Sequence, residues 1–178
     1  PVSGHDAWTN EIPARDGTEY LPERLSAAGY MTAAVGCFDH AAKCEGETFG
    51  YKYRKTMDNP PNGNYYKALK KKHPEVTTQY PADKNRRFLY GEEDFYDTWN
   101  AECAIEFIDS YAKDGCAPNG ARPDEEGAPF FLYCGFNAPH GPYIAPKECE
   151  GTVDPSKIPS FKHSGRPPED IPEVELYR

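Results

Sequence analysis

Polar side chains that could hold an anion follow two apolar segments of this chain. The segments cover residues 31–36 and 129–136. The polar residues are Cys37, Asp39 and His40 after the first segment, and Asn137 and His140 after the second. A histidine ring nitrogen can donate a hydrogen bond to an anionic oxygen, and neighbouring polar side chains can hold the rest of the anion. If the two segments end side by side, these residues form one binding pocket.

Each apolar segment is predicted to be a strand that follows an amphipathic helix. The first helix is expected from about residue 18 to 28, and residues 31–36 read as a short buried strand. Thr18 is a plausible N-cap, and Leu21, Leu25 and Ala28 are expected to form its buried stripe.

The second helix–strand unit has the clearer pattern. A helix is predicted over residues 98–113, capped by Asp97 or Thr98 and ended by Gly115. Its apolar positions recur at three- and four-residue spacing: Trp99, Cys103, Phe107, Ile108 and Tyr111. The nearly continuous apolar run at 129–136 favours a central strand covered on both faces. Alternation of helices and strands indicates an α/β fold with a largely parallel sheet, in which ligands bind at the carboxyl ends of strands.

The remaining segments carry weaker signals. Residues 41–96 are polar and read as an irregular insertion, with a short basic helix over 64–72 whose lysines, Lys70, Lys71 and Lys72, form a solvated face. Residues 144–178 are a proline-rich excursion. Together with units 1–40 and 97–143, they are interpreted as a single incomplete domain over residues 1–178.

Composition narrows the class of protein. The 178 residues are enough for one domain, and the net charge of −9 disfavours nucleic acid as a partner. No apolar run reaches the ~20 residues of a membrane span. Six cysteines contain no C-x-x-C pair, so a zinc cluster is not expected. Cys103 and Cys134 lie among apolar residues and are predicted to be buried free thiols.

Three stretches of the sequence resemble patterns of the sulfatase family, and the two longer ones occur in the same order as in that family. Residues 20–36 resemble its "L-x-x-x-L-x-x-A-G-Y-x-T-x-x-V-G-K" pattern, and residues 129–143 resemble its "P-F-F-L-Y-x-x-x-x-x-P-H-x-P" pattern. Residues 4–10 are similar to a "G-x-W-x-N" turn of choline-sulfatase-like and phosphonate-monoesterase-like members. The resemblance implies a partial alkaline-phosphatase-like sandwich. It also implies a sulfuric-ester hydrolase that acts on a sulfated small molecule or carbohydrate.

The resemblance also assigns roles to individual residues. His140 matches the family's sulfate-contacting histidine, and Asn10 matches an asparagine that lines the pocket of phosphonate-type relatives. The family's Gly-Lys is Gly36-Cys37 here, so a lysine that would pair with sulfate is missing. A partner histidine falls at Asp39 under one spacing and at His40 under a longer one. Cys37, Asp39 and Asn137 are therefore expected to line the substrate pocket.

Other parts of the implied chemistry are expected outside these residues. Neither the C-x-P-S-R nucleophile motif nor an Asp-Asp pair occurs in the chain. The formylglycine nucleophile and the ligands of a divalent cation, Ca²⁺ by resemblance, are expected in flanking sequence, so this fragment alone is predicted to be inactive. The alternatives are a phosphonate monoester or phosphodiester hydrolase, and a non-catalytic binding module. The oligomeric state stays open. The resemblance favours an extracellular, periplasmic or lysosome-like location.

Overall fold

The computed structural model describes residues 17–37, 48–57 and 63–159. The chain divides into two compact units, residues 1–148 and residues 149–178. The first unit contains the helices α1 (Leu21–Ala27), α2 (Asn64–Lys72) and α3 (Tyr96–Asp114) and the strands β1 (Met31–Gly36), β2 (Tyr53–Thr56) and β3 (Phe130–Gly135). In the second unit, the described residues include a short 3-10 helix, Pro155–Lys157. Within the described ranges, no helix is both long and apolar enough to cross a membrane.

The sheet is parallel, with strand order β2-β1-β3, which confirms the α/β class. Every residue of β1 is buried, as the sequence predicts. β2 was not predicted, because its sequence Tyr-Arg-Lys-Thr carries no apolar run. The expectation that β3 is a central strand is wrong for the described sheet. β3 lies at its edge, with Phe130 and Tyr133 exposed by 42% and 39%. Apolar composition alone did not fix the strand order, and β1 takes the central place.

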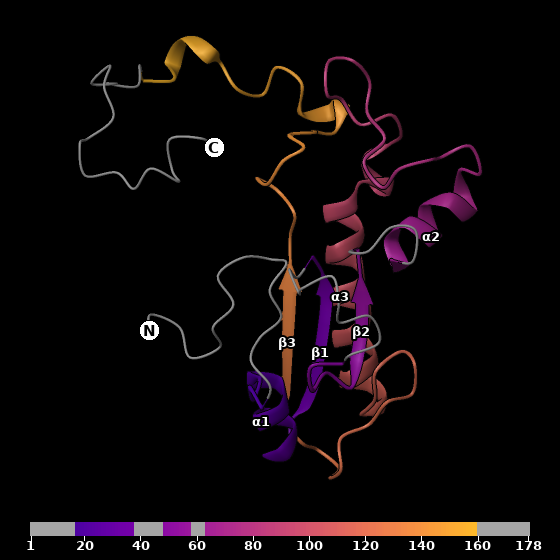
Figure 1. Cartoon of the computed structure of the whole chain (residues 1–178), viewed down its shortest axis with the longest axis vertical. Helices are drawn as coiled ribbons and strands as arrows, with labels where there is room; N and C mark the ends of the chain where they lie inside the picture. The colour runs from indigo at the N-terminus through magenta and orange to yellow at the C-terminus, as the bar shows by residue number, and fades with distance from the viewer. Residues whose placement is uncertain (1–16, 38–47, 58–62, 160–178) are drawn as a thin grey trace. The chain divides into compact units, whose positions relative to one another are not determined.

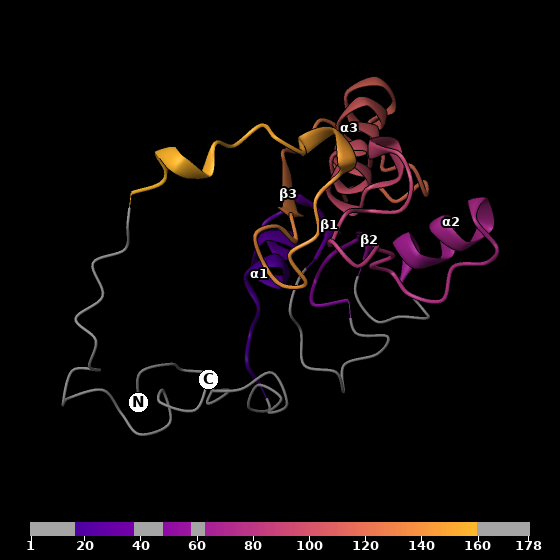
Figure 2. The same ribbon diagram turned by 90° about the horizontal axis from the view of Figure 1, so that it is seen from above.

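The main core lies between α3 and one face of the sheet, while α1 lies on the other side (Figures 1 and 2). Each residue of this core exposes less than a tenth of its surface: Met31, Ala33, Val35, Tyr53, Cys103, Ala104, Phe107 and Ala117. Phe107 stacks on Tyr53, with ring centroids 5.6 Å apart, and joins the helix to β2. Ile108, which was expected on the same stripe, is 42% exposed. Cys103 is a buried free thiol as predicted, whereas Cys134 is only half-buried.

The start and the buried face of α1 differ from the prediction. α1 begins at Leu21, not near Thr18, because the backbone N–H of Tyr20 donates to the Glu23 carboxylate at 2.8 Å and closes the first turn. Its predicted stripe is wrong, since Leu21 is 59% exposed. Pro22 is the buried residue of α1 because the turn at Phe49 and Gly50 packs against the first turn of the helix.

α3 and α2 follow their patterns more closely. Gly115 ends α3 in the left-handed conformation, with φ of 63°, as a C-cap glycine should. The N-cap is Phe95, so Asp97 lies inside the first turn and neither Asp97 nor Thr98 is the cap. α2 spans the predicted residues, and Lys70, Lys71 and Lys72 are exposed as predicted.

A second cluster of buried, mostly aromatic residues comes chiefly from the chain between β2 and the start of α3. Its buried residues are Met57, Tyr65, Tyr66, Leu69, Val76, Phe88, Phe95, Tyr96 and Ile144. Cys37 and Tyr80 pack against its margin. Within the stretch predicted to be irregular, residues 63–96 therefore form a packed layer beside the carboxyl end of β1. This layer supplies one wall of the site described next.

Candidate functional site

Two glycines bring the carboxyl ends of β1 and β3 together. Gly36 and Gly135 are partners in the parallel register, and the backbone N–H of Cys37 donates to the Gly135 carbonyl at 2.9 Å. A Cβ on Gly135 would lie 1.9 Å from the carbonyl oxygen of Cys37, and one on Gly36 would lie 2.0 Å from that of Gly135. Gly36 also has φ of +91°, which side chains rarely adopt. Bulkier residues would separate these ends, which point the same way in Figure 1.

Asp97 holds the loop that follows β3. Its Oδ1 accepts the backbone N–H of Asn137 at 2.7 Å, and its Oδ2 accepts that of Ala138 at 3.0 Å. Asn100, one turn further along α3, donates from Nδ2 to the Gly135 carbonyl at 3.1 Å and to Asp97 Oδ1 at 3.3 Å. The loop is thus fixed to the first turns of α3 by hydrogen bonds that include a charged acceptor.

A pocket of about 270 Å³ opens at these strand ends. It is lined by Cys37, Tyr80, Tyr133, Phe136, Asn137, His140 and Gly141. The structure therefore brings together three of the predicted site residues, Cys37, Asn137 and His140. The other three, Asn10, Asp39 and His40, lie outside the described residues. The lining residues just named include no lysine and no arginine, so His140 is the one basic side chain among them.

The ring of His140 is oriented by its own loop. Nδ1 lies 2.6 Å from the carbonyl oxygen of Gly141, and the backbone N–H donates to the Asn137 carbonyl at 2.8 Å. Because a carbonyl oxygen only accepts, Nδ1 must carry the proton in this contact. The neutral ring then has a lone pair at Nε2, and Nε2 can donate only when the ring is protonated. An oxyanion contacted at Nε2 therefore requires the imidazolium form.

Asn137 places an amide at the base of the pocket. It is 5% exposed, and its Oδ1 accepts the Tyr80 hydroxyl at 3.4 Å. Its Nδ2 makes no hydrogen bond of standard geometry with the described residues. Burial raises the pKa of the Tyr96 hydroxyl, and the neighbouring side-chain amide of Asn137 acts in the opposite direction. A buried N–H₂ without a full partner is a donor that a ligand oxygen could satisfy.

Aromatic side chains form the rest of the wall. The Tyr133 hydroxyl donates to the Cys37 carbonyl at 3.3 Å, and Tyr80 meets Tyr96 edge-on with ring centroids 5.5 Å apart. Phe136 is 55% exposed. Tyr80, Tyr133 and Asp97 were not predicted as site residues. Asp97 had a detectable signal, an acid at a helix start, but no local pattern shows a partner forty residues away.

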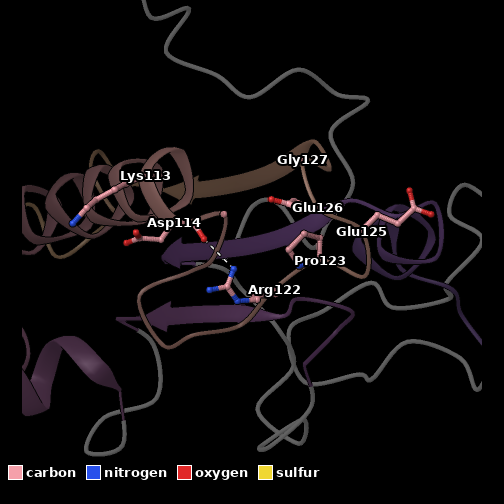
Figure 3. A pocket seen from close by; sticks show the side chains of 8 residues that line it. Lys113, Asp114, Arg122, Pro123, Glu125, Glu126 and Gly127 are labelled. Atoms are coloured by element: carbon pink, nitrogen blue, oxygen red, sulfur yellow. Dashed lines mark hydrogen bonds between the residues drawn. The ribbon is translucent and has the colours of Figure 1, made fainter.

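Another hollow, about 500 Å³, lies at the carboxyl end of α3. Its lining residues are Lys113, Asp114, Gly115, Arg122, Pro123, Glu125, Glu126 and Gly127. Arg122 donates from Nη1 to the Asp114 carbonyl at 2.9 Å, as Figure 3 shows. This contact satisfies a terminal carbonyl of α3, and mixed charges surround it. None of the predicted site residues lies here.

Among residues 17–37, 48–57 and 63–159, no three His, Cys, Asp or Glu side chains are grouped so as to hold a metal ion. The divalent cation that the sulfatase resemblance implies, with its ligands in flanking sequence, stays an expectation. No protein-family model matches the chain, and no curated protein matches it. The resemblance to sulfatases accordingly remains an expectation.

Proposed function

We propose that this chain supplies one side of the oxyanion pocket of a sulfatase-type ester hydrolase with an alkaline-phosphatase-like fold. A single observation carries the proposal: Cys37, Asn137 and His140 line one pocket where two adjacent parallel strands end in register. The ligand would be the sulfate group of a small molecule or carbohydrate. The formylglycine nucleophile and the divalent cation, with its ligands, are assigned to sequence outside these residues.

The described residues support binding and orientation rather than bond cleavage. In this proposal, protonated His140 donates from Nε2 to a non-bridging oxygen, and Asn137 donates from Nδ2 to a second oxygen. Hydrogen bonds to a charged partner contribute about 1.5–3 kcal/mol each. The rings of Tyr80, Tyr133 and Phe136 offer flat apolar surface to the organic part of the ester.

The first test is sulfate binding as a function of pH. Sulfate affinity is expected to be higher in acidic than in alkaline solution, because Nε2 of His140 donates only in the imidazolium form. His140→Ala should weaken binding by about 10- to 100-fold at the acidic end. His140→Gln is the matched control, since its amide donates at every pH and should leave a weaker, pH-independent affinity. A pH slope that survives in both variants would contradict the assigned contact.

A second test concerns the missing lysine. Cys37→Lys should tighten sulfate binding, because an ammonium would stand in the pocket wall opposite His140. Isothermal titration with sulfate measures this directly, with Cys37→Ser as the neutral control. If sulfate affinity is the same for the lysine and serine variants, residue 37 does not face the anion.

The second candidate, a phosphonate monoester or phosphodiester hydrolase, fits the same pocket as the first. Since no lysine or arginine occurs among the described lining residues, the pocket suits an anion that carries one charge. Sulfate monoesters, phosphonate monoesters and phosphodiesters all meet that condition. Turnover of one aryl ester of each kind by the complete enzyme separates the candidates. Binding without turnover of any of them would instead identify a binding module. In an active enzyme, His140→Ala should lower turnover by about 10²-fold or more.

A further inference from the structure

We propose that Asp97 is the positioning residue of this site, and that its carboxylate sets oxyanion affinity without touching the ligand. The inference rests on the proposed function. Asp97 accepts two consecutive backbone N–H groups, those of Asn137 and Ala138, at 2.7 and 3.0 Å. Both of its oxygens are therefore committed to the loop that carries the pocket residues.

The contacts of the loop show how this effect reaches His140. The carbonyl of Asn137, whose N–H Asp97 holds, accepts the backbone N–H of His140 at 2.8 Å. The ring of His140 in turn donates from Nδ1 to Gly141 at 2.6 Å. Asp97 Oδ2 thus holds the N–H of the Asn137–Ala138 peptide, the carbonyl of that same peptide holds the backbone N–H of His140, and the imidazole makes a separate hydrogen bond to Gly141. Removing the Asp97 carboxylate frees the loop that carries both predicted anion donors.

The charge of Asp97 is also compatible with a nearby anion. Its carboxylate lies in the first turn of α3, where the helix dipole stabilises negative charge, and it accepts from Asn100 as well at 3.3 Å. Three N–H donors and the helix end offset the negative charge that would otherwise repel an oxyanion. Asparagine would lower the repulsion but keep only one acceptor oxygen for the two loop amides. The structure therefore predicts that neutralising Asp97 weakens anion binding, the opposite of what simple charge repulsion predicts.

The variants are Asp97→Asn and Asp97→Glu, with Asp109→Asn as the matched control. Asp109 is an exposed acid on the same helix, and its loss removes the same charge. The first measurement is amide hydrogen exchange at Asn137 and Ala138, with the amides of β1 as an internal reference for global unfolding. Asp97→Asn should speed exchange at the two loop amides by about 10- to 100-fold while β1 stays protected. Asp97→Glu should restore part of the protection.

The second measurement is titration with inorganic sulfate, followed through the ring nitrogens of His140 by NMR. Asp97→Asn should weaken sulfate binding about tenfold and Asp109→Asn should not. Unchanged loop protection in Asp97→Asn would overturn the inference, and so would lost protection with wild-type sulfate affinity. Both results leave the proposed function standing. Failure of the complete protein that contains this chain to bind sulfate at all would overturn the proposed function, and this inference with it.

Discussion

Replacing Gly135 with alanine tests whether the close approach of the two strand ends builds the site. The new methyl group would lie 1.9 Å from the carbonyl oxygen of Cys37 and 2.9 Å from Cε1 of Tyr133. The first of these contacts is with backbone, which cannot rotate away as a side chain can. The chain must therefore move Cys37 away from β3.

The size of the effect follows from two contributions. Forcing a methyl group into a packed position destabilises a protein by about 1–3 kcal/mol. Losing the 2.9 Å hydrogen bond from Cys37 N–H to the Gly135 carbonyl removes roughly 1 kcal/mol more. The free energy of unfolding should thus fall by about 2–4 kcal/mol, which lowers Tm by roughly 4–16 °C in a protein of this size.

Urea and thermal unfolding, followed by circular dichroism, measure the loss. Gly91→Ala is the matched control, because its φ of −70° suits alanine and its new methyl group meets only the movable carboxylate of Glu93. That control should stay within about 0.5 kcal/mol of wild type. A Gly135→Ala protein that is as stable as the control would refute the claim that the strand ends need glycine there. Sulfate titration of the same variant would show whether the pocket is lost with the contact.

The other predictions concern burial and charge. Asn100→Ala should lower the free energy of unfolding, measured in urea melts, by about 2–4 kcal/mol. The substitution leaves the buried Gly135 carbonyl without its side-chain donor and opens a cavity. A variant as stable as the wild type would contradict this prediction. Burial raises the pKa of the Cys103 thiol to about 11, so a thiol reagent should modify exposed Cys149 well before Cys103 in the native protein, and equal rates would show that Cys103 is accessible. Burial raises the pKa of Asp94, but hydrogen bonds from neighbouring cations lower it by more, to below its ordinary 3.8. The stability from this carboxylate is therefore present at neutral pH and lost as the pH falls through the depressed pKa. Asp94→Asn should accordingly be less stable than wild type at pH 7 and approach it in acid, whereas a constant difference would argue against this linkage.

Local pattern was enough to predict the two strands that form the site. The apolar runs at 31–36 and 129–136 contain β1 and β3, and three of the polar residues after them, Cys37, Asn137 and His140, line one pocket. The reason is geometric: parallel neighbours end at the same edge of a sheet, so residues after each strand meet.

The remaining features depend on contacts between distant segments, which a single sequence does not display. β2 is polar, and its place beside β1 is visible only in the pairing of Ala33 with Tyr53. Asp97 looked like a helix cap, yet its partners are Asn137 and Ala138. The exposed side of α1 was assigned wrongly because the turn that covers its first residues comes more than twenty residues later.

The position of β3 has a practical consequence for handling this chain. Among the residues that the structure describes, β3 pairs with a strand on one side only, and such a strand leaves alternate backbone amides and carbonyls open along the other. In β3 those groups are accompanied by exposed Phe130 and Tyr133, and the strand contains neither proline nor a charged residue. Concentrated samples should therefore self-associate through this edge, and a lysine placed at residue 130 would be expected to keep them monomeric.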